Sequence, residues 1–197
     1  MDHFATPGYD KLELRTRSAN VMGLLGLDHG GNTILSFGLN PDQVVKQFEL
    51  GTASLDERLQ AARACQEAGY PVRFRLDPLV AIDGWEEQYS QMIERALPTV
   101  VPEQVTLGSY HLLGNLSRVI AERFPESPLL GPKLERDGEG LRYPHELRRR
   151  LYEFVTAEIR RLNESVPISV CKETPRMWSE LGTMIARGEC SCHPQLA

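Results

Sequence analysis

Residues 51–74, GTASLDERLQAARACQEAGYPVRF, have the pattern of a helix that leads directly into a β-strand. Ser54 and Glu57 have the spacing of a capping box, and apolar residues follow them at helical intervals. Gly69 favours the left-handed conformation that ends a helix, and Pro71 prevents its continuation. The next run, VRFRLDP, alternates apolar and polar residues and predicts a short strand that stops at Asp77-Pro78.

Strand-like and helix-like segments alternate in the same way along most of the chain. Because strands separated by amphipathic helices pair in parallel through right-handed crossovers, the pattern predicts one α/β domain over residues 1–197. A closed eight-stranded barrel takes about 250 residues, so about five parallel strands with outer helices predict a partial (β/α) barrel or an open sheet. Strands are expected at 11–16, 32–39, 72–76, 103–108 and 167–171, and helices near 20–26, 41–48, 54–68, 83–97, 113–123, 145–162 and 174–181.

Two segments fall outside this alternation. Residues 125–144, PESPLLGPKLERDGEGLRYP, are rich in proline, glycine and charge and are long for a plain connector. We expect them to form a functional loop or an irregular hairpin. The end of the chain, 186–197, is expected to form a loose tail.

Composition narrows the classes of function. An apolar fraction of 41% without an apolar run of membrane-spanning length indicates a soluble protein, and the first residues lack the apolar core of a secretion signal. A cytoplasmic location is therefore expected. The net charge of -5 argues against a nucleic-acid footprint over the whole surface but leaves room for a local cationic groove. The arginines of 136–161 stand among acidic residues, which favours a solvated helix face with local ion pairs.

The four cysteines give little sign of a metal site or a disulfide framework. Cys65 lies on the apolar face of its helix and is expected in the core. Cys171, Cys190 and Cys192, together with His193, are weak candidates for a zinc site, because Cys-x-Cys is not the usual zinc spacing. Disulfides are not expected in a cytoplasmic protein.

The ends of the expected strands carry polar residues, and in parallel α/β folds the ligand lies beyond the carboxyl ends of the strands. Such residues also start turns and cap helices, so any one of them has a simpler explanation. Taken as a set, they favour a binding face for a polar ligand with carboxylate, amine and hydroxyl groups. The residues are Arg17, Ser18 and Asn20 after the first strand, Asn40 after the second, Asp77 after the third, Ser109, Tyr110 and His111 after the fourth, and Cys171, Lys172 and Glu173 after the fifth.

Several motifs resemble those of a known family. The segments are LDHGGNT at 27–33, LNP at 39–41, FELGTASLDERL at 48–59, AGYPVRFRLDP at 68–78 and GWEEQY at 84–89. They resemble the later part of the spore photoproduct lyase family of radical S-adenosylmethionine proteins, over roughly residues 11–97. The resemblance returns more loosely at 142–192, with CKETPRMW and CSC.

The resemblance implies a partial (β/α)₆ barrel that binds a [4Fe–4S] cluster and S-adenosylmethionine and generates a 5′-deoxyadenosyl radical. In the namesake enzyme this radical repairs a thymine dimer in DNA. The cluster motif of the family, C-x-x-x-C-x-x-C, is absent from this chain. We therefore expect the cofactor- and substrate-binding C-terminal portion of such an enzyme, inactive alone, which self-associates or needs a cluster-bearing N-terminal half.

By motif position, the resemblance implies five cofactor-binding residues. Arg17 falls where the family has a basic residue that faces the cofactor. Gly38 and Asn40 fall in the strand that ends Ser-x-Asn in the family, and here glycine replaces the serine and removes a hydroxyl donor. Arg75 and Asp77 line the next strand end.

The expected substrate contacts come from the second half of the chain. Arg142-Tyr143 resembles the basic-aromatic hairpin that engages the lesion in the namesake enzyme, because such a pair can hold a phosphate and stack on a flipped base. His111 is grouped with this pair. A packed tyrosine beside a surface arginine is an equally simple explanation. No catalytic residue is assigned, and the alternative function is a non-catalytic module that binds nucleic acid or a cluster-bearing partner.

Overall fold

The computed structural model describes residues 11–131, 134–137 and 140–185, and a parallel sheet forms its centre. Five strands lie in the order β1-β2-β3-β4-β8, and all four neighbouring pairs are parallel. The α/β class with five parallel strands is confirmed. The strands are β1 (Leu12–Thr16), β2 (Thr33–Gly38), β3 (Val72–Leu79), β4 (Gln104–Ser109) and β8 (Ile168–Val170).

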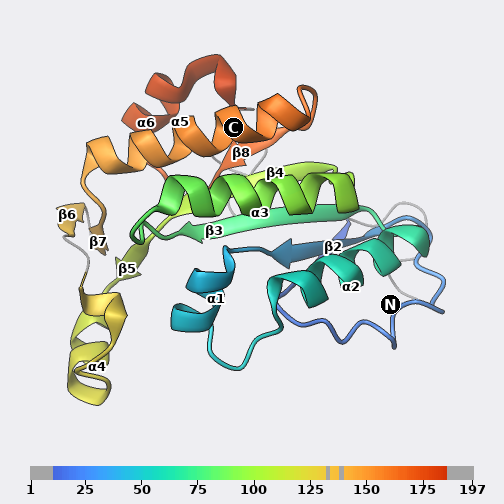
Figure 1. Ribbon diagram of the computed structural model, residues 1–197, viewed down its shortest axis with the longest axis horizontal. Helices are drawn as coiled ribbons and strands as arrows, with labels where there is room; N and C mark the ends of the chain where they lie inside the picture. Colours follow the sequence, from blue (N-terminus) through green and yellow to red (C-terminus); the bar gives the residue numbers. More distant parts are fainter. Residues whose placement is uncertain (1–10, 132–133, 138–139, 186–197) are drawn as a thin grey trace.

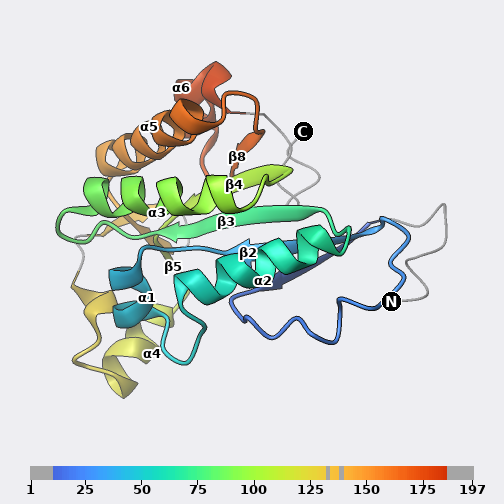
Figure 2. The same cartoon turned by 45° about the vertical axis from the view of Figure 1, so that its right-hand side comes forward.

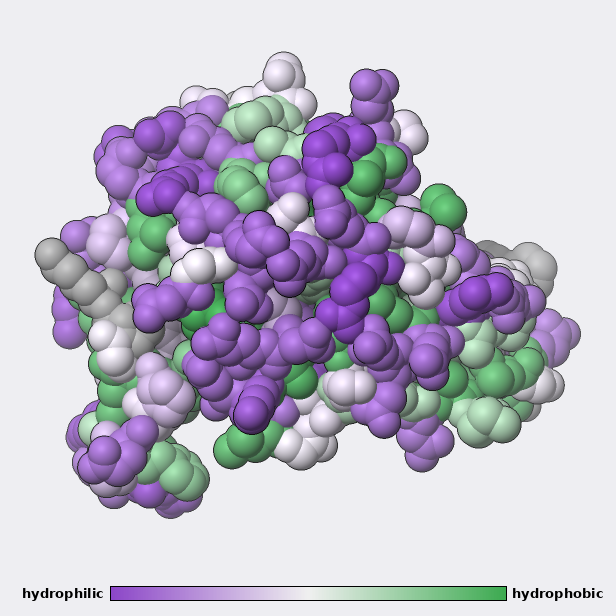
Figure 3. Space-filling view, in the orientation of Figure 1, coloured by the Kyte–Doolittle hydropathy of each residue, from purple (hydrophilic) through white to green (hydrophobic). Residues whose placement is uncertain are grey.

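Helices cover one face of this sheet. In Figures 1 and 2, α2, α3 and α5 run side by side along the strands, and α6 lies beyond α5. Their outward surface is mostly hydrophilic in Figure 3. The helices are α1 (Asp42–Phe48), α2 (Leu55–Glu67), α3 (Trp85–Thr99), α4 (Leu116–Arg123), α5 (His145–Leu162) and α6 (Pro175–Leu181), with short 3₁₀ turns η1 (Pro128–Leu130) and η2 (Gly182–Met184).

The two faces of the sheet differ in chemistry. In β3, Val72, Phe74 and Leu76 join the hydrophobic core, whereas the alternate residues Arg73 and Arg75 point to the opposite side. The same alternation holds in neighbouring strands, where Leu35, Phe37, Val105, Leu107, Ile168 and Val170 pack into the core. The face away from the helices is therefore polar, as suits a surface that lines a binding site.

A second, antiparallel sheet lies at the carboxyl ends of the parallel strands. It has the order β5-β7-β6, from β5 (His111–Leu113), β6 (Glu135–Asp137) and β7 (Gly140–Arg142). Figure 1 shows it with α4 at the end toward which β2 and β3 point. The described parts of 125–144 thus hold η1 and the pair β6 and β7.

Most of the expected helix starts are present. Ser54 and Glu57 form the predicted capping box of α2, and Thr174 caps α6 through the amide of Met177. Such a cap stabilises a helix by about 1 kcal/mol. The helix expected from Asp83 begins at Trp85, after Gly84 in the left-handed conformation, and no side chain caps it.

One expected helix and one expected strand end are also wrong. Residues 20–26 form turns instead of a short helix. β3 does not stop at Asp77-Pro78: it runs to Leu79, which pairs with Ser109 after a register shift. A bulge accommodates the proline, because Pro78 cannot donate a hydrogen bond to the ladder. Within the described part of the chain, none of the helices has the length and apolar character needed to cross a lipid bilayer.

Candidate functional site

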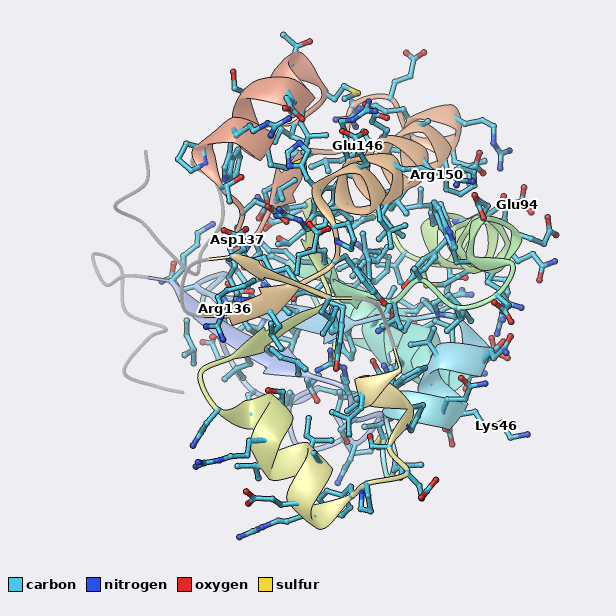
Figure 4. The ribbon with its side chains drawn as sticks, turned by 90° about the vertical axis from the view of Figure 1, so that its left-hand side faces the viewer. Lys46, Glu94, Arg136, Asp137, Glu146 and Arg150 are labelled. Carbon is cyan, nitrogen blue, oxygen red and sulfur yellow. The ribbon has the colours of Figure 1, made fainter. Side chains whose placement is uncertain are left out.

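A cleft of about 870 Å³ opens at the carboxyl ends of the parallel strands. Figure 4 looks at this end, with α4 below, the small sheet across the middle and α5 above. This volume lies in the range of sites for small ligands and cofactors. The lining residues include Arg15, Thr16, Arg17, Ser36, Gly38, Arg75, Asp77, Pro78, Ser109, Tyr110, His111, Leu112, Leu116, Ile120, Leu129, Arg142, Cys171 and Lys172.

The lining combines polar groups from the parallel sheet with apolar groups from the inserted segment. Leu112, Leu116, Ile120 and Leu129 come from β5, α4 and η1. Tyr110 donates to the carbonyl of Leu129 at 2.8 Å, and burial raises the pKa of its phenol to about 12, so it stays neutral. The cleft can therefore contact an apolar ring on one side and charged groups on the other.

Arg17 bridges two strands at one edge of the cleft. Its Nη2 donates to the backbone oxygen of Asp77 at 2.7 Å, and its Nε pairs with Glu49 at 3.1 Å. Gly38 lies beneath it, and a Cβ at that position would meet the Arg17 Cγ at 3.0 Å. The glycine that replaces the serine of the family pattern therefore gives the arginine side chain its room.

Asn40 lies in a buried network and does not line this cleft. Its amide donates to Glu49 at 2.8 Å and accepts from Tyr89, whose hydroxyl also accepts from the amide of Val80. Burial raises the pKa of Tyr89 well above its ordinary value. Asn40 borders a smaller neighbouring pocket of about 330 Å³ and, through Glu49, fixes the position of Arg17.

The Asp77 carboxylate is held by cations and by close packing. Its Oδ2 accepts from Arg75 at 3.0 Å and lies 3.8 Å from the Lys172 ammonium group. It packs against Gly108, where an added Cβ would lie 2.6 Å from Oδ1. The carboxylate therefore orients the neighbouring cations.

Lys172, at the end of the fifth parallel strand, also lines the cleft and is not among the residues that the family resemblance marks. It has a φ of 55°, a left-handed conformation that residues other than glycine rarely adopt. Its side chain is 50% exposed and lines the cleft. No sequence pattern marks the left-handed conformation of Lys172, because it goes with contacts such as the hydrogen bond from Arg142 to the Lys172 carbonyl.

Glu173 fastens the end of β8 to the small sheet and α5. Its carboxylate accepts from Tyr152 at 2.9 Å, from Ser109 at 3.2 Å and from Arg148, and Arg142 lies 3.6 Å away. Burial and the Glu173 carboxylate together raise the pKa of Tyr152 well above its ordinary value. The Glu of CKETP is therefore a buried anchor.

The two residues of the expected basic-aromatic pair have different surroundings. Arg142 lines the cleft, donates to the Lys172 carbonyl at 2.6 Å and pairs with Asp137 at 3.5 Å. Tyr143 is buried, and its hydroxyl accepts from the amide of Ala81 at 3.1 Å. Burial raises the pKa of its phenol. In this conformation Tyr143 packs in the core and is not positioned to stack on a base.

His111 lines the cleft beside two cations. Burial lowers the pKa of its imidazole, and the charges of Arg142 and Lys172 lower it further. Its Nε2 is buried against Gly140 and has no hydrogen-bond partner among the described residues. Ser36, also in the lining, is fully buried and its hydroxyl likewise lacks a partner there. Both groups suit contact with a polar ligand.

The described residues offer no evident metal centre. Across 11–131, 134–137 and 140–185, His, Cys, Asp and Glu do not form a group of three that could hold a metal ion. Cys65 and Cys171 are buried thiols, and burial raises the pKa of Cys65. Cys190, Cys192 and His193 lie outside the described residues. The residues described therefore do not fit a [4Fe–4S] cluster, which needs thiolate ligands on a preset loop.

The cleft brings together Arg17, Gly38, Arg75, Asp77, His111 and Arg142 of the expected site residues. Asn40 and Tyr143 lie away from it in their buried networks. Sequence reasoning did not select Arg15, Ser36 and Lys172, which also line the cleft. The alternation in KLELRTR could have indicated that Arg15 and Arg17 share a face.

A parallel α/β sheet with a polar cleft at the carboxyl ends of its strands is the architecture of partial barrels, which carry their ligand sites at that end. Comparison with known proteins identifies the family to which this fold belongs. The family model described as spore photoproduct lyase matches residues 1–175. The chain belongs to the spore photoproduct lyase family.

Individual relatives agree with this membership. The spore photoproduct lyase of Bacillus subtilis (strain 168) is 36% identical over 148 residues, which are 73% of this chain and 42% of that protein. That of Geobacillus sp. (strain Y412MC61) is 36% identical over 126 residues, or 61% of this chain and 37% of that protein. The chain thus spans about two fifths of these curated relatives.

Solved structures of spore photoproduct lyase have the same fold. The complex with dinucleoside spore photoproduct superposes with a TM-score of 0.72 at 28% identity, over 85% of this chain and 52% of that one. A double mutant of the lyase with bound AdoMet and dinucleoside spore photoproduct gives a TM-score of 0.73 at 27% identity, over 87% of this chain and 53% of that one.

Proposed function

We propose that this chain is the cofactor- and substrate-binding part of a radical S-adenosylmethionine lyase that repairs DNA lesions of the spore photoproduct type. The observation that carries the proposal is the cleft at the carboxyl ends of the strands, in a chain of this family. A related structure holds AdoMet and dinucleoside spore photoproduct. A cytoplasmic site of action is part of the proposal, since thiols stay reduced there.

The polar lining supports this assignment chemically. Arg17, Arg75 and Lys172 can meet anionic groups, while the unpartnered Ser36 hydroxyl can bond a ribose or a base. The apolar side around Leu116 and Ile120 can lie against a nucleobase. The cleft thus suits a ligand that combines rings, hydroxyls and a negative charge.

The iron–sulfur chemistry must come from outside the described residues. S-adenosylmethionine, when bound, supplies the radical after reductive cleavage at a cluster. Residues of this chain would orient the cofactor and the lesion and exclude water. We propose that a half with the C-x-x-x-C-x-x-C motif supplies the cluster and lies beside β1, the end of the sheet order.

Reconstitution tests this function. The chain is mixed anaerobically with the cluster-bearing N-terminal half of the Bacillus subtilis relative, a reductant, AdoMet and dinucleoside spore photoproduct. We expect 5′-deoxyadenosine and repaired dithymidine only when both halves are present. Product from the N-terminal half alone, or none from the mixture despite formation of a complex, would contradict the proposal.

The second candidate is a binding module without catalysis, favoured by the lack of a cluster site among the described residues. It predicts that the chain binds dinucleotides or the cluster-bearing half with no turnover in any mixture. The reconstitution above separates the two functions, because binding without 5′-deoxyadenosine supports the module.

A further inference from the structure

Lys172 carries charge in the cleft that its neighbours among the described residues do not balance. Of the residues that the structure describes, five cations line the cleft against one carboxylate, Asp77. Each arginine among them lies close to an acidic partner: Arg15 to Glu13 at 3.2 Å, Arg17 to Glu49 at 3.1 Å, Arg75 to Asp77 at 3.0 Å and Arg142 to Asp137 at 3.5 Å. Lys172 shares Asp77 at 3.8 Å, and Arg75 is already closer to that carboxylate.

The backbone around Lys172 is fixed on both sides. The amide of Cys171 donates to Leu107 in β4 at 2.7 Å, and Glu173 is locked by Tyr152 and its other partners. The carbonyl of Lys172 itself accepts from Arg142 at 2.6 Å. These contacts hold the residue in its left-handed conformation and keep its half-exposed side chain at the cleft.

A purely structural role explains this arrangement poorly. Glycine or asparagine would adopt the left-handed conformation with less strain than lysine. An ion pair at 3.8 Å from a half-exposed side chain contributes little to stability. The position therefore favours a function for the ammonium group.

We propose that Lys172 binds a singly charged oxyanion of the ligand. Asp77 is then the counter-ion of Lys172 within the protein and does not itself contact the ligand. This inference rests on the proposed function and deepens it. A phosphodiester and a carboxylate each carry one negative charge at neutral pH. The oxyanion is thus either the phosphodiester that joins the two nucleosides of the lesion or the carboxylate of S-adenosylmethionine.

The test compares Lys172→Gln with Lys46→Gln, a control that removes an exposed lysine pointing outward from α1 (Figure 4). Calorimetry at low salt measures two ligand pairs with the full chain. One pair is thymidylyl-thymidine and its uncharged methylphosphonate, and the other is AdoMet and decarboxylated AdoMet. Thermal melting confirms that each variant is folded.

We expect Lys172→Gln to weaken the oxyanion-bearing member of one pair about tenfold or more and not to weaken the partner that lacks the oxyanion. Loss for thymidylyl-thymidine identifies the phosphodiester, and loss for AdoMet identifies the carboxylate. Lys46→Gln should match the wild type. Equal affinities of the wild type and Lys172→Gln for all four ligands would overturn the inference.

Inorganic phosphate separates failure of this inference from failure of the proposed function. If neither AdoMet nor thymidylyl-thymidine binds the wild type, the proposed function fails for the chain alone. The inference still holds if phosphate shifts the NMR resonances of residues 171–173 in the wild type and not in Lys172→Gln. Identical phosphate responses, or none, would overturn it.

Discussion

At the scale of single residues, the cleft is organised by cations whose geometry is set by buried carboxylates. Glu49 positions Arg17, Asp77 positions Arg75, and Glu173 lies beside Arg142. Buried or half-buried carboxylates with several donors hold such side chains in a single orientation. A ligand then meets groups that are already in place, which lowers the entropy lost on binding.

The strain at Lys172 gives a stability prediction. Lys172→Asn should raise the free energy of unfolding by about 1 kcal/mol, because asparagine tolerates the left-handed conformation better. Urea unfolding measures the difference. Lys172→Gln is the matched control, since it removes the charge and keeps the strain. A loss of stability in Lys172→Asn alone would contradict this explanation.

The pKa of His111 should report on the charge of the cleft. Burial lowers it first, Arg142, Lys172 and Arg148 lower it too, and Asp137 raises it, so the imidazole is neutral at pH 7. NMR of the ring should show titration below the ordinary value of about 6.5, and Lys172→Gln should move the midpoint upward.

The same shift links His111 to stability. The unfolded chain takes up the proton first as the pH falls, so the stabilisation linked to the neutral ring is present above about pH 6.5. It is lost as the pH falls through the lowered pKa of the folded state. A ring that titrates at or above its ordinary value would rule out this contribution.

At the scale of elements, the contact between β3 and β4 depends on Gly108. A side chain there would overlap the Asp77 carboxylate, which Arg75 holds in place. Gly108→Ala should therefore lower the free energy of unfolding by about 1–3 kcal/mol and displace Asp77. Urea unfolding tests it, with Gly23→Ala as the control, because nothing lies within 4 Å of a Cβ at Gly23. Equal stability of the two variants would show that Asp77 moves freely.

The elements were largely predictable from the sequence because their signals are local. The capping box at Ser54 predicts the start of α2 correctly, and the apolar stripe of α5 predicts the extent of that helix. β3 ran past its predicted end because its pairing with β4 outweighs the local effect of Pro78. The start of α3 was placed two residues early, because Gly84 in the left-handed conformation precedes the helix.

The cleft was only partly predictable, since strand ends can be read from a pattern but side-chain neighbours cannot. Arg17 and Asp77 were found because parallel strands end at one edge of the sheet. Tyr143 is buried, and its hydroxyl accepts a hydrogen bond from Ala81, which is distant in sequence. Lys172, in its left-handed conformation, likewise accepts a backbone hydrogen bond from the distant Arg142.

At the scale of the whole molecule, the β1 edge of the sheet is less buried than its centre. β1 is half-buried at the end of the strand order, whereas β3 has a strand on each side and buried core residues. We expect the amides of β1 to exchange with solvent faster than those of β3. Mass spectrometry of hydrogen exchange measures this, and an equally slow β1 at low protein concentration would contradict it.

Association should change that pattern at one place. If the cluster-bearing half of a relative, or a second copy of this chain, lies against β1, exchange in β1 slows and exchange in β3 does not. Light scattering at the same concentrations should show a dimer or a heavier complex. Protection that appears at α6 instead would place the contact at the other end of the sheet.

The position of the small sheet in the chain has an evolutionary consequence. β5, α4, η1, β6 and β7 are inserted between β4 and β8, which are direct neighbours in the parallel sheet. Mutation can therefore lengthen, shorten or replace residues 111–142 while β4 and β8 keep their pairing. Since this insertion supplies Leu116, Ile120 and Arg142 to the cleft, descendants of one ancestral gene can change the shape and charge of the cleft and inherit the sheet unaltered.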